Sequence, residues 1–161
     1  MSTPLIRPAV PSDAEAIARV HVQAWNETYP HILSAELLAS VTVEDRTRRW
    51  QRILRQAEGQ QFVAEAGGII VGFVGTGPAR DDDAPCPLEL YSIYLLASHH
   101  GSGAGQALLD AAIGERPAYL WVAAENLRAQ AFYRRNGFTA DGSRIEQLRG
   151  EKLPELRMTR R

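Results

Sequence analysis

The sequence predicts a mixed α/β fold built around one central sheet. Short apolar runs, typical of strands, alternate along the chain with segments in which apolar residues recur at helical spacing. The pair Gly67-Gly68 separates two apolar runs and indicates a β-hairpin. Residues 88–109 pass from an apolar strand through a glycine-dense turn into an amphipathic helix. At 161 residues, the chain is long enough for one domain, residues 1–161, with a substantial core.

The elements follow in order from local patterns. Leu5–Pro8 indicates a short strand, and Ser12-Asp13-Ala14-Glu15 has the spacing of a capping box for a helix that reaches about Tyr29. Ser34 and Thr42 are placed to start two further helices. We expect the remaining elements as helices through residues 38 and 54, strands at 61–66, 69–76 and 88–96, a helix from 105, a strand at 119–122, a helix from 126, and strands from 138 and at 153–159.

Composition excludes several classes of function. The formal net charge is −1, so no overall field favours nucleic acid or an anionic membrane surface. The single Cys86 forbids an intrachain disulfide. No apolar stretch approaches the roughly 20 residues of a membrane span, and the N-terminus lacks the apolar core of a signal peptide. We therefore expect a cytoplasmic protein with neither nucleic acid nor membrane as a partner.

The glycine-dense turn has a physical use. Gly101, Gly103 and Gly105 allow a ligand to approach the main chain closely and precede a helix whose first N–H groups lack intrahelical acceptors. An anion such as a diphosphate suits that position. The turn is neither a P-loop, because no Lys-Ser or Lys-Thr follows, nor a GxGxxG dinucleotide fingerprint. The alternative is a glycine-rich connection that binds no ligand.

Two motifs in order resemble the GNAT family of N-acetyltransferases. The family's diphosphate loop corresponds to His100-Gly101-Ser102-Gly103-Ala104-Gly105, with His where the family has Arg or Gln. The second motif is a short strand, Tyr119–Val122, followed by Asn126 and by Phe132-Tyr133-Arg134-Arg135-Asn136-Gly137-Phe138. The resemblance covers about Leu5 to Met158, essentially the whole chain.

This resemblance implies a fold and an activity. The GNAT fold is a mixed, mostly antiparallel, splayed sheet of about six or seven strands flanked by about four or five helices. The implied activity is transfer of an acetyl group from acetyl-CoA, the cosubstrate, to a primary amine of a small molecule or peptide by direct attack in a ternary complex, without a metal. The alternative is a non-catalytic acyl-CoA sensor that regulates a partner. Many members are dimers, so a homodimer is one expected form.

The resemblance also implies a set of cofactor-binding residues. Main-chain groups at the end of the apolar strand pair with the pantetheine arm in the family, and one of their N–H groups is the expected oxyanion donor. Asn126 contacts the same arm, or alternatively only caps its helix. The implied residues are Ile93, Tyr94, Leu95, His100, Gly101, Ser102, Gly103, Ala104, Gly105, Gln106, Asn126 and Tyr133.

The implied catalytic residues are Tyr133 and Glu89. Tyr133 corresponds to the family's Tyr near the thioester sulfur and is the candidate general acid; the alternative is a Tyr packed between helix and sheet. Glu89 lies four residues before Ile93, so strand alternation places both on one face, where a branch of the family has its general base. The alternatives are an ordinary carboxylate at Glu89 or a role for Tyr91. Another branch has its base at the position of Trp121, so that base is absent.

The acceptor side is expected near the first helices. Trp25, Tyr29, His31 and Trp50 supply aromatic rings that suit an amine-bearing substrate, although core packing is favoured for Trp50. The acidic run Asp81-Asp82-Asp83 is interpreted as a solvated loop, with attraction of a cationic acceptor as the alternative. No histidine has metal-ligand spacing with a cysteine or another histidine.

Overall fold

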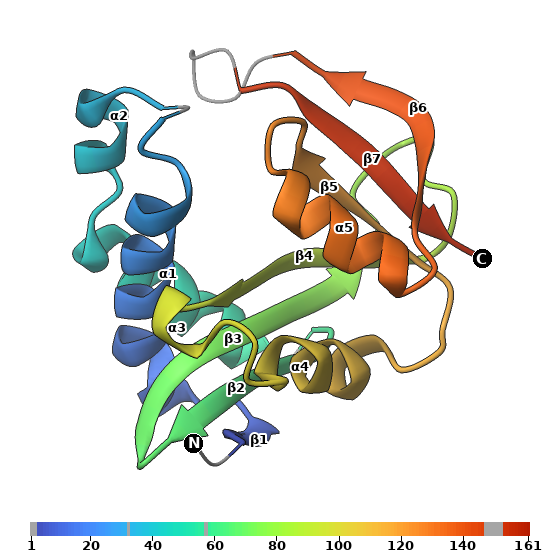
Figure 1. Cartoon of the computed structure of the whole chain (residues 1–161). Coiled ribbons are helices and arrows are strands. Elements are labelled where there is room, and N and C mark those ends of the chain that lie inside the picture. The colour runs from blue at the N-terminus through green and yellow to red at the C-terminus, as the bar shows by residue number, and fades with distance from the viewer. Residues whose placement is uncertain (1–2, 32, 57, 147–152) are drawn as a thin grey trace.

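The computed structural model describes residues 3–31, 33–56, 58–146 and 153–161, and its centre is one seven-stranded sheet (Figure 1). The strands are β1 (Leu5–Pro8), β2 (Gln61–Ala66), β3 (Ile69–Pro78), β4 (Leu88–Leu95), β5 (Ala118–Ala123), β6 (Thr139–Ile145) and β7 (Glu155–Arg160). The helices are α1 (Ala14–Thr28), α2 (Ala35–Ser40), α3 (Val43–Gln56), α4 (Ala104–Ile113) and α5 (Leu127–Arg135), with 3-10 turns at Pro11–Asp13 and Ala97–His99. The predicted fold class is confirmed.

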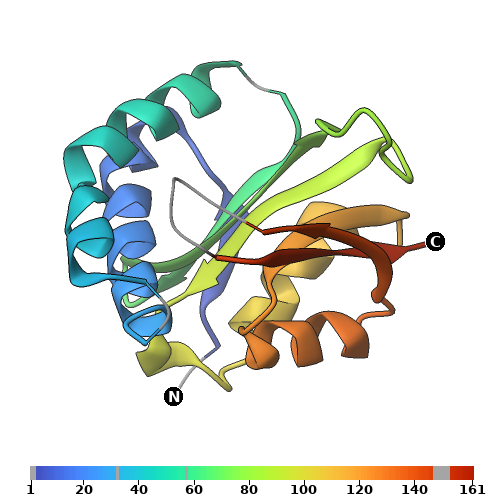
Figure 2. The same ribbon diagram turned by 90° about the horizontal axis from the view of Figure 1, so that it is seen from above.

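The strands lie in the order β1-β2-β3-β4-β5-β7-β6. All neighbours are antiparallel except β4 and β5, which are parallel. Helices α1 and α3 pack on each other and cover one face of the first four strands, while α4 covers the opposite face (Figures 1 and 2). The core between these layers is apolar and includes Phe73, Leu108 and Phe138, each fully buried.

Side-chain caps start three helices where the sequence placed them. Ser34, Thr42 and Asn126 each accept a hydrogen bond from the main-chain N–H three residues later, at 3.1, 3.2 and 3.1 Å. The expected cap at Ser12 is wrong, because Ser12 lies inside the 3-10 turn that precedes α1. Asp13 instead accepts a hydrogen bond from the N–H of Val10 at 2.8 Å and forms an ion pair with Arg7 at 2.8 Å.

The sheet splays open between its two parallel strands. Strands β4 and β5 pair only at Glu89 with Tyr119 and at Leu90 with Leu120, after which they diverge (Figure 1). On the other side of β4, the register with β3 shifts so that Tyr91 is the extra residue of a β-bulge. A bulge bends its strand and increases the local twist, which turns the rest of β4 away from β5. The splay that the resemblance implies is therefore present, and a bulge accompanies it.

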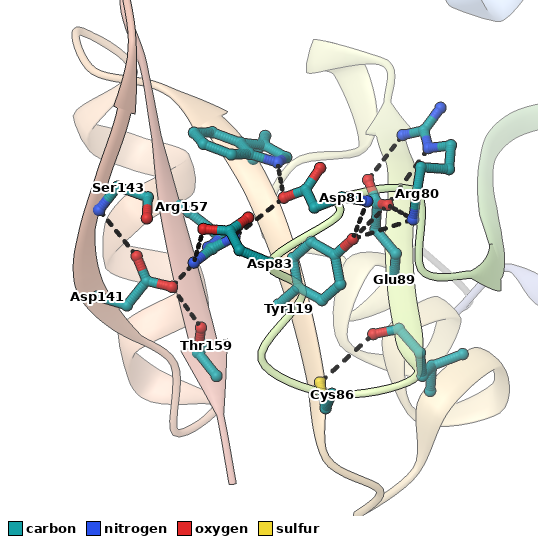
Figure 3. Close-up of polar contacts among 12 residues, drawn as sticks. Arg80, Asp81, Asp83, Cys86, Glu89, Tyr119, Asp141, Ser143, Arg157 and Thr159 are labelled. Atoms are coloured by element: carbon teal, nitrogen blue, oxygen red, sulfur yellow. Dashed lines mark hydrogen bonds and ion pairs between the residues drawn. The ribbon is translucent and has the colours of Figure 1, made fainter.

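The loop before β4 fastens the two halves of the sheet outside this opening (Figure 3). Arg157 on β7 forms ion pairs with Asp81 at 3.1 Å, with Asp83 at 2.9 Å and with Asp141 on β6 at 2.6 Å. Asp81 also accepts a hydrogen bond from the indole N–H of Trp121 at 2.9 Å. The interpretation of this acidic run as a solvated loop is therefore wrong for Asp81, whose side chain is 21% exposed, whereas Asp82 and Asp83 are exposed as expected. None of the described helices is both long enough and apolar enough to span a bilayer.

Candidate active site

A cavity of about 470 Å³ fills the opening between β4 and β5. Its walls are the second half of β4, the loop and first turn of α4, the end of β5, and α5. Ten of the twelve predicted cofactor-binding residues line it, and the exceptions are Ser102 and Ala104. The side chain of Ala104 is fully buried beneath the loop. Two chain segments far apart in sequence thus meet around one space of the size that holds small-molecule ligands.

Main-chain amides without acceptors face this cavity at the start of α4. None of the hydrogen bonds in the described part of the chain uses the N–H of Gly101, Gly103, Gly105 or Gln106. Gly101 and Gly103 have φ of +82° and +88°, and a Cβ added at either would meet no atom within 4 Å. The space in front of these amides is therefore open. Unengaged N–H groups at a helix N-terminus bind anions, so this end of the cavity fits a diphosphate.

The polar side chains of the same loop make local contacts. The imidazole Nε2 of His100 lies 3.0 Å from the carbonyl oxygen of Leu95, which closes the turn between β4 and α4. Ser102 accepts a weak hydrogen bond from the N–H of Ala104 at 3.3 Å. Gln106 donates to Asp110 and Asn136, at 2.9 and 2.7 Å. Anion binding at this loop therefore depends chiefly on its main chain.

The open edge of β4 forms one wall. Ile93, Tyr94 and Leu95 are paired with β3 on one side, and no described strand pairs with them on the other. The hydroxyl of Tyr94 accepts a hydrogen bond from the indole N–H of Trp25 at 2.9 Å, and its ring stacks on His21 with a centroid distance of 5.1 Å. A strand edge of this kind can hydrogen-bond to an extended chain laid beside it.

Asn126 and Tyr133 face the cavity from α5. Asn126 caps this helix, and a hydrogen bond with its side chain lowers the pKa of Tyr29, although burial is the larger effect and raises that pKa. Tyr133 is 8% exposed and packs edge-on against Phe132 and Phe138. Burial raises the pKa of Tyr133, so its hydroxyl stays protonated at neutral pH. No described residue forms a hydrogen bond with that hydroxyl, which is therefore available to a ligand in the cavity.

A second cavity, of about 400 Å³, lies on the α1 and α3 side of β4. Trp25 and Trp50 line it, as expected for the acceptor side, and Trp50 also packs against Phe73 in the core. Tyr29 lines the first cavity, whereas His31 lines neither. The two cavities share four lining residues: Tyr91, Ser92, Tyr94 and Glu155. Two ligands held in these spaces would therefore meet at the bulge of β4.

Glu155 is the carboxylate at this junction, and the sequence reasoning missed it. It is half-buried at the start of β7, where its main chain pairs with β5 and β6, and no hydrogen bond or ion pair joins its carboxylate to another described residue. Burial raises the pKa of Glu155, and the charge of Arg80 opposes that shift. A lone glutamate at the start of the last strand gives no signal in one sequence, because its neighbours Tyr29 and Arg80 are distant along the chain. The same applies to Arg128 and Arg135 on α5, which line the first cavity.

Glu89, the predicted base, lines neither cavity. Its carboxylate is 2% exposed at the closed end of the splay, where it pairs with Arg80 at 2.7 Å and accepts the hydroxyl proton of Tyr119 at 2.8 Å (Figure 3). The expectation that alternation puts Glu89 and Ile93 on one face fails, because the bulge at Tyr91 inserts a residue between them. Tyr91, the rival candidate, donates its hydroxyl proton to the carbonyl of Pro78.

No group of three or more His, Cys, Asp or Glu in the described ranges is arranged to hold a metal ion. The sequence of this chain is similar to those of known proteins. The Acetyltransferase (GNAT) family matches residues 16–138. The uncharacterized N-acetyltransferase YuaI of Bacillus subtilis is 32% identical over 127 residues, which are 75% of this chain and 72% of the relative.

Two solved structures share the fold. The PaiA N-acetyltransferase of Thermoplasma acidophilum, in complex with coenzyme A, aligns with a TM-score of 0.72 and 21% identity over 100% of this chain and 99% of that one. YncA of Salmonella typhimurium, with acetyl-CoA, aligns with a TM-score of 0.70 and 21% identity over 98% of this chain and 93% of that one. The splayed sheet is thus an arrangement found in proteins solved with a coenzyme A compound.

Proposed function

Since the chain belongs to the GNAT family of acetyltransferases, we propose that it transfers an acetyl group from acetyl-CoA to a primary amine of a small molecule or peptide. The amine attacks the thioester directly in a ternary complex, and no covalent intermediate on the enzyme is needed. One observation supports this proposal above the others: a single cavity connects the unengaged amides of α4 with the buried hydroxyl of Tyr133.

In this proposal the residues of the first cavity hold the coenzyme along its length. The amides of Gly101, Gly103 and Gly105 bind the diphosphate, and the dipole of α4 adds to their attraction. Arg128 and Arg135 line the same cavity and supply the cationic side chains that His100 does not, since its ring contacts Leu95. The open edge of β4 pairs with the pantetheine arm, with Asn126 opposite, and one of its N–H groups stabilises the oxyanion.

Tyr133 donates the proton that the leaving thiolate needs. Its raised pKa keeps the hydroxyl protonated at neutral pH, and no described residue competes for it. Glu155 accepts the proton of the attacking amine, because it lies where the two cavities meet and its carboxylate is unengaged. A carboxylate whose pKa is raised by burial is a stronger base than an exposed one. Glu89 has no direct part in this mechanism.

Calorimetry with acetyl-CoA and a thiol-release assay with a panel of primary amines test this proposal. Tyr133→Phe is expected to lower kcat by about 100-fold, because a general acid contributes about 10²–10⁴-fold, while the Kd for acetyl-CoA stays unchanged. Tyr119→Phe is the matched control, because it removes a phenol outside both cavities and leaves kcat intact. Absence of acetyl-CoA binding would overturn the proposal. Tight binding without thiol release for any amine would favour the non-catalytic sensor.

A further inference from the structure

The second cavity has a cationic wall. Arg46, Arg49 and Arg52 recur at intervals of three along α3 and therefore share one face of that helix, and all three line the cavity. Arg80 adds a fourth guanidinium from the loop before β4. Two carboxylates line the same space, the exposed Glu58 and the half-buried Glu155. Four positive charges thus face two negative ones.

The positive charges are concentrated at the α3 end. The guanidinium of Arg80 is balanced by buried Glu89 behind it, at 2.7 Å, and lies 4.0 Å from the centroid of the Tyr91 ring. Arg46 is only 5% exposed and lies 5.9 Å from the ring of Trp25. A charge set into a low-dielectric wall acts on a ligand in the cavity more strongly than a charge at the surface does. The exposed Arg49 and Arg52 extend this field along the helix.

Of the two carboxylates, Glu155 is the one that lies next to the first cavity. Glu155 belongs to β7 and borders the first cavity, whereas the three arginines belong to α3 and do not. The cavity therefore has an anionic side next to the site of acetyl transfer and a cationic side away from it. A ligand that places an amine at the anionic side and an anion at the cationic side is complementary to both sides.

We propose that the acceptor is a primary amine that also carries a carboxylate or phosphate group, which the arginines of α3 bind. The inference rests on the proposed function and specifies its substrate. Guanidinium groups match the geometry of both anions through paired N–H donors. The alternative of a cationic acceptor drawn to residues 81–83 loses its basis, because Asp81 and Asp83 are ion-paired with Arg157 and neither lines this cavity.

A panel of paired amines tests this proposal. The ω-amino acids from glycine to 6-aminohexanoate are each compared with the corresponding amide, and O-phosphoethanolamine is compared with ethanolamine, by thiol release from acetyl-CoA. The best acid is expected to exceed its neutral partner in kcat/KM by at least about tenfold, a preference carried by KM, because the anion contacts no reacting atom. The two arms distinguish a carboxylate from a phosphate. Spermidine serves as the cationic probe.

Two matched double variants locate the effect. Arg49→Gln with Arg52→Gln removes two charges from the cavity wall, and the preference for the anionic amine is expected to fall to about twofold or less. Arg48→Gln with Arg55→Gln removes two exposed charges of the same helix that do not line the cavity, and the preference is expected to persist. All four positions are exposed, so both variants are expected to fold.

The outcomes separate this inference from the proposed function. Turnover of neutral amines or spermidine as efficient as that of every acid would overturn the inference and leave the acetyltransferase standing. Equal loss of preference in both double variants would also overturn it. If no amine releases thiol although acetyl-CoA binds, the proposed function fails. In that case, calorimetry with the same acids and amides tests the inference by itself. Selective binding of the acid that is lost only in the Arg49 and Arg52 double variant supports the inference.

Discussion

Two carboxylates at opposite ends of the β4–β5 junction show how position decides what a glutamate does. Glu89 lies at the closed end, 1% exposed, with Arg80 and Tyr119 as partners. Glu155 lies at the open end, half-buried, and its carboxylate has no hydrogen bond or ion pair to a described residue. Both carboxylate oxygens of Glu89 accept hydrogen bonds, and these bonds join β4 to β5 and to the loop before β4. Glu155 borders both cavities, so it is the one able to exchange a proton with a ligand.

Burial alone therefore does not mark a functional carboxylate. Glu89 is the more buried of the two, and its oxygens accept hydrogen bonds from the guanidinium of Arg80 and the hydroxyl of Tyr119. Burial raises the pKa of Tyr119 to about 12, which keeps its hydroxyl a donor to Glu89. What distinguishes Glu155 is partial burial without a partner, beside a space that a substrate can enter.

The largest expected effect comes from Glu155→Gln. We expect kcat to fall by about 100-fold, because the amine loses its proton acceptor. Burial raises the pKa of Glu155 above its ordinary 4.5, so the wild-type kcat/KM should decrease as pH falls through that raised value, and the variant should lose this limb of the profile. Glu125→Gln, an exposed carboxylate outside both cavities, is the control. An unchanged pH profile in Glu155→Gln would assign the base elsewhere.

Stability should respond to Glu155 in the opposite sense from activity. A carboxyl group whose pKa is higher in the folded state binds its proton more readily when folded, so its ionisation lowers stability as pH rises through the raised value. Removal of the charge in Glu155→Gln should therefore not decrease the free energy of unfolding at neutral pH. A clear loss of stability in urea titrations would indicate a partner for Glu155 and weaken its assignment as the base.

Glu89→Gln should give the reverse pattern. We expect the free energy of unfolding to decrease by about 2 kcal/mol, less than the roughly 3–5 kcal/mol of a fully buried pair, because the side chain of Arg80 is 55% exposed. The kcat of the folded variant should stay within about threefold of wild type, since Glu89 lines neither cavity. Glu15→Gln breaks an exposed pair with Arg19 and serves as the control for stability. A large fall in kcat without a loss of stability would restore Glu89 as a catalytic residue.

The smallest expected effect distinguishes a glycine that serves ligand binding, Gly103, from one that serves only a turn, Gly68. Gly103→Ala places a methyl group at φ +88°, where nothing lies within 4 Å, so it acts through backbone strain of about 1 kcal/mol. Acetyl-CoA affinity, measured by calorimetry, should fall several-fold because the loop amides move. Gly68→Ala, at φ +80° and equally uncrowded in the β2–β3 turn, should lose similar stability without losing affinity. Equal affinity in both variants would argue against the loop as the anion site.

The sequence predicted the elements and the glycine-dense turn before α4 well because both depend on local patterns. Apolar periodicity, the Ser34 cap and the alternating glycines each act within a few residues. The expectation that Glu89 and Ile93 share a face was wrong because one inserted residue at Tyr91 breaks strand alternation, and alternation is all that a single sequence offers there. Glu155 was missed because its environment comes from α1, β4 and the loop at Arg80, which only the folded chain brings together.

The contacts of Arg157 have a consequence for how variants of this protein are interpreted. Strands β4 and β5 share only two paired positions, and the ion pairs of Arg157 with Asp81 and Asp83 are among the contacts that join the two halves of the sheet there, with the hydrogen bonds of Trp121 and Tyr119. Arg157, Asp81 and Asp83 lie outside both cavities, yet their loss is expected to change the width of the opening between β4 and β5. An inactive Arg157 variant would therefore be evidence of an altered width of this opening, and direct contact between that guanidinium and a substrate would need separate proof.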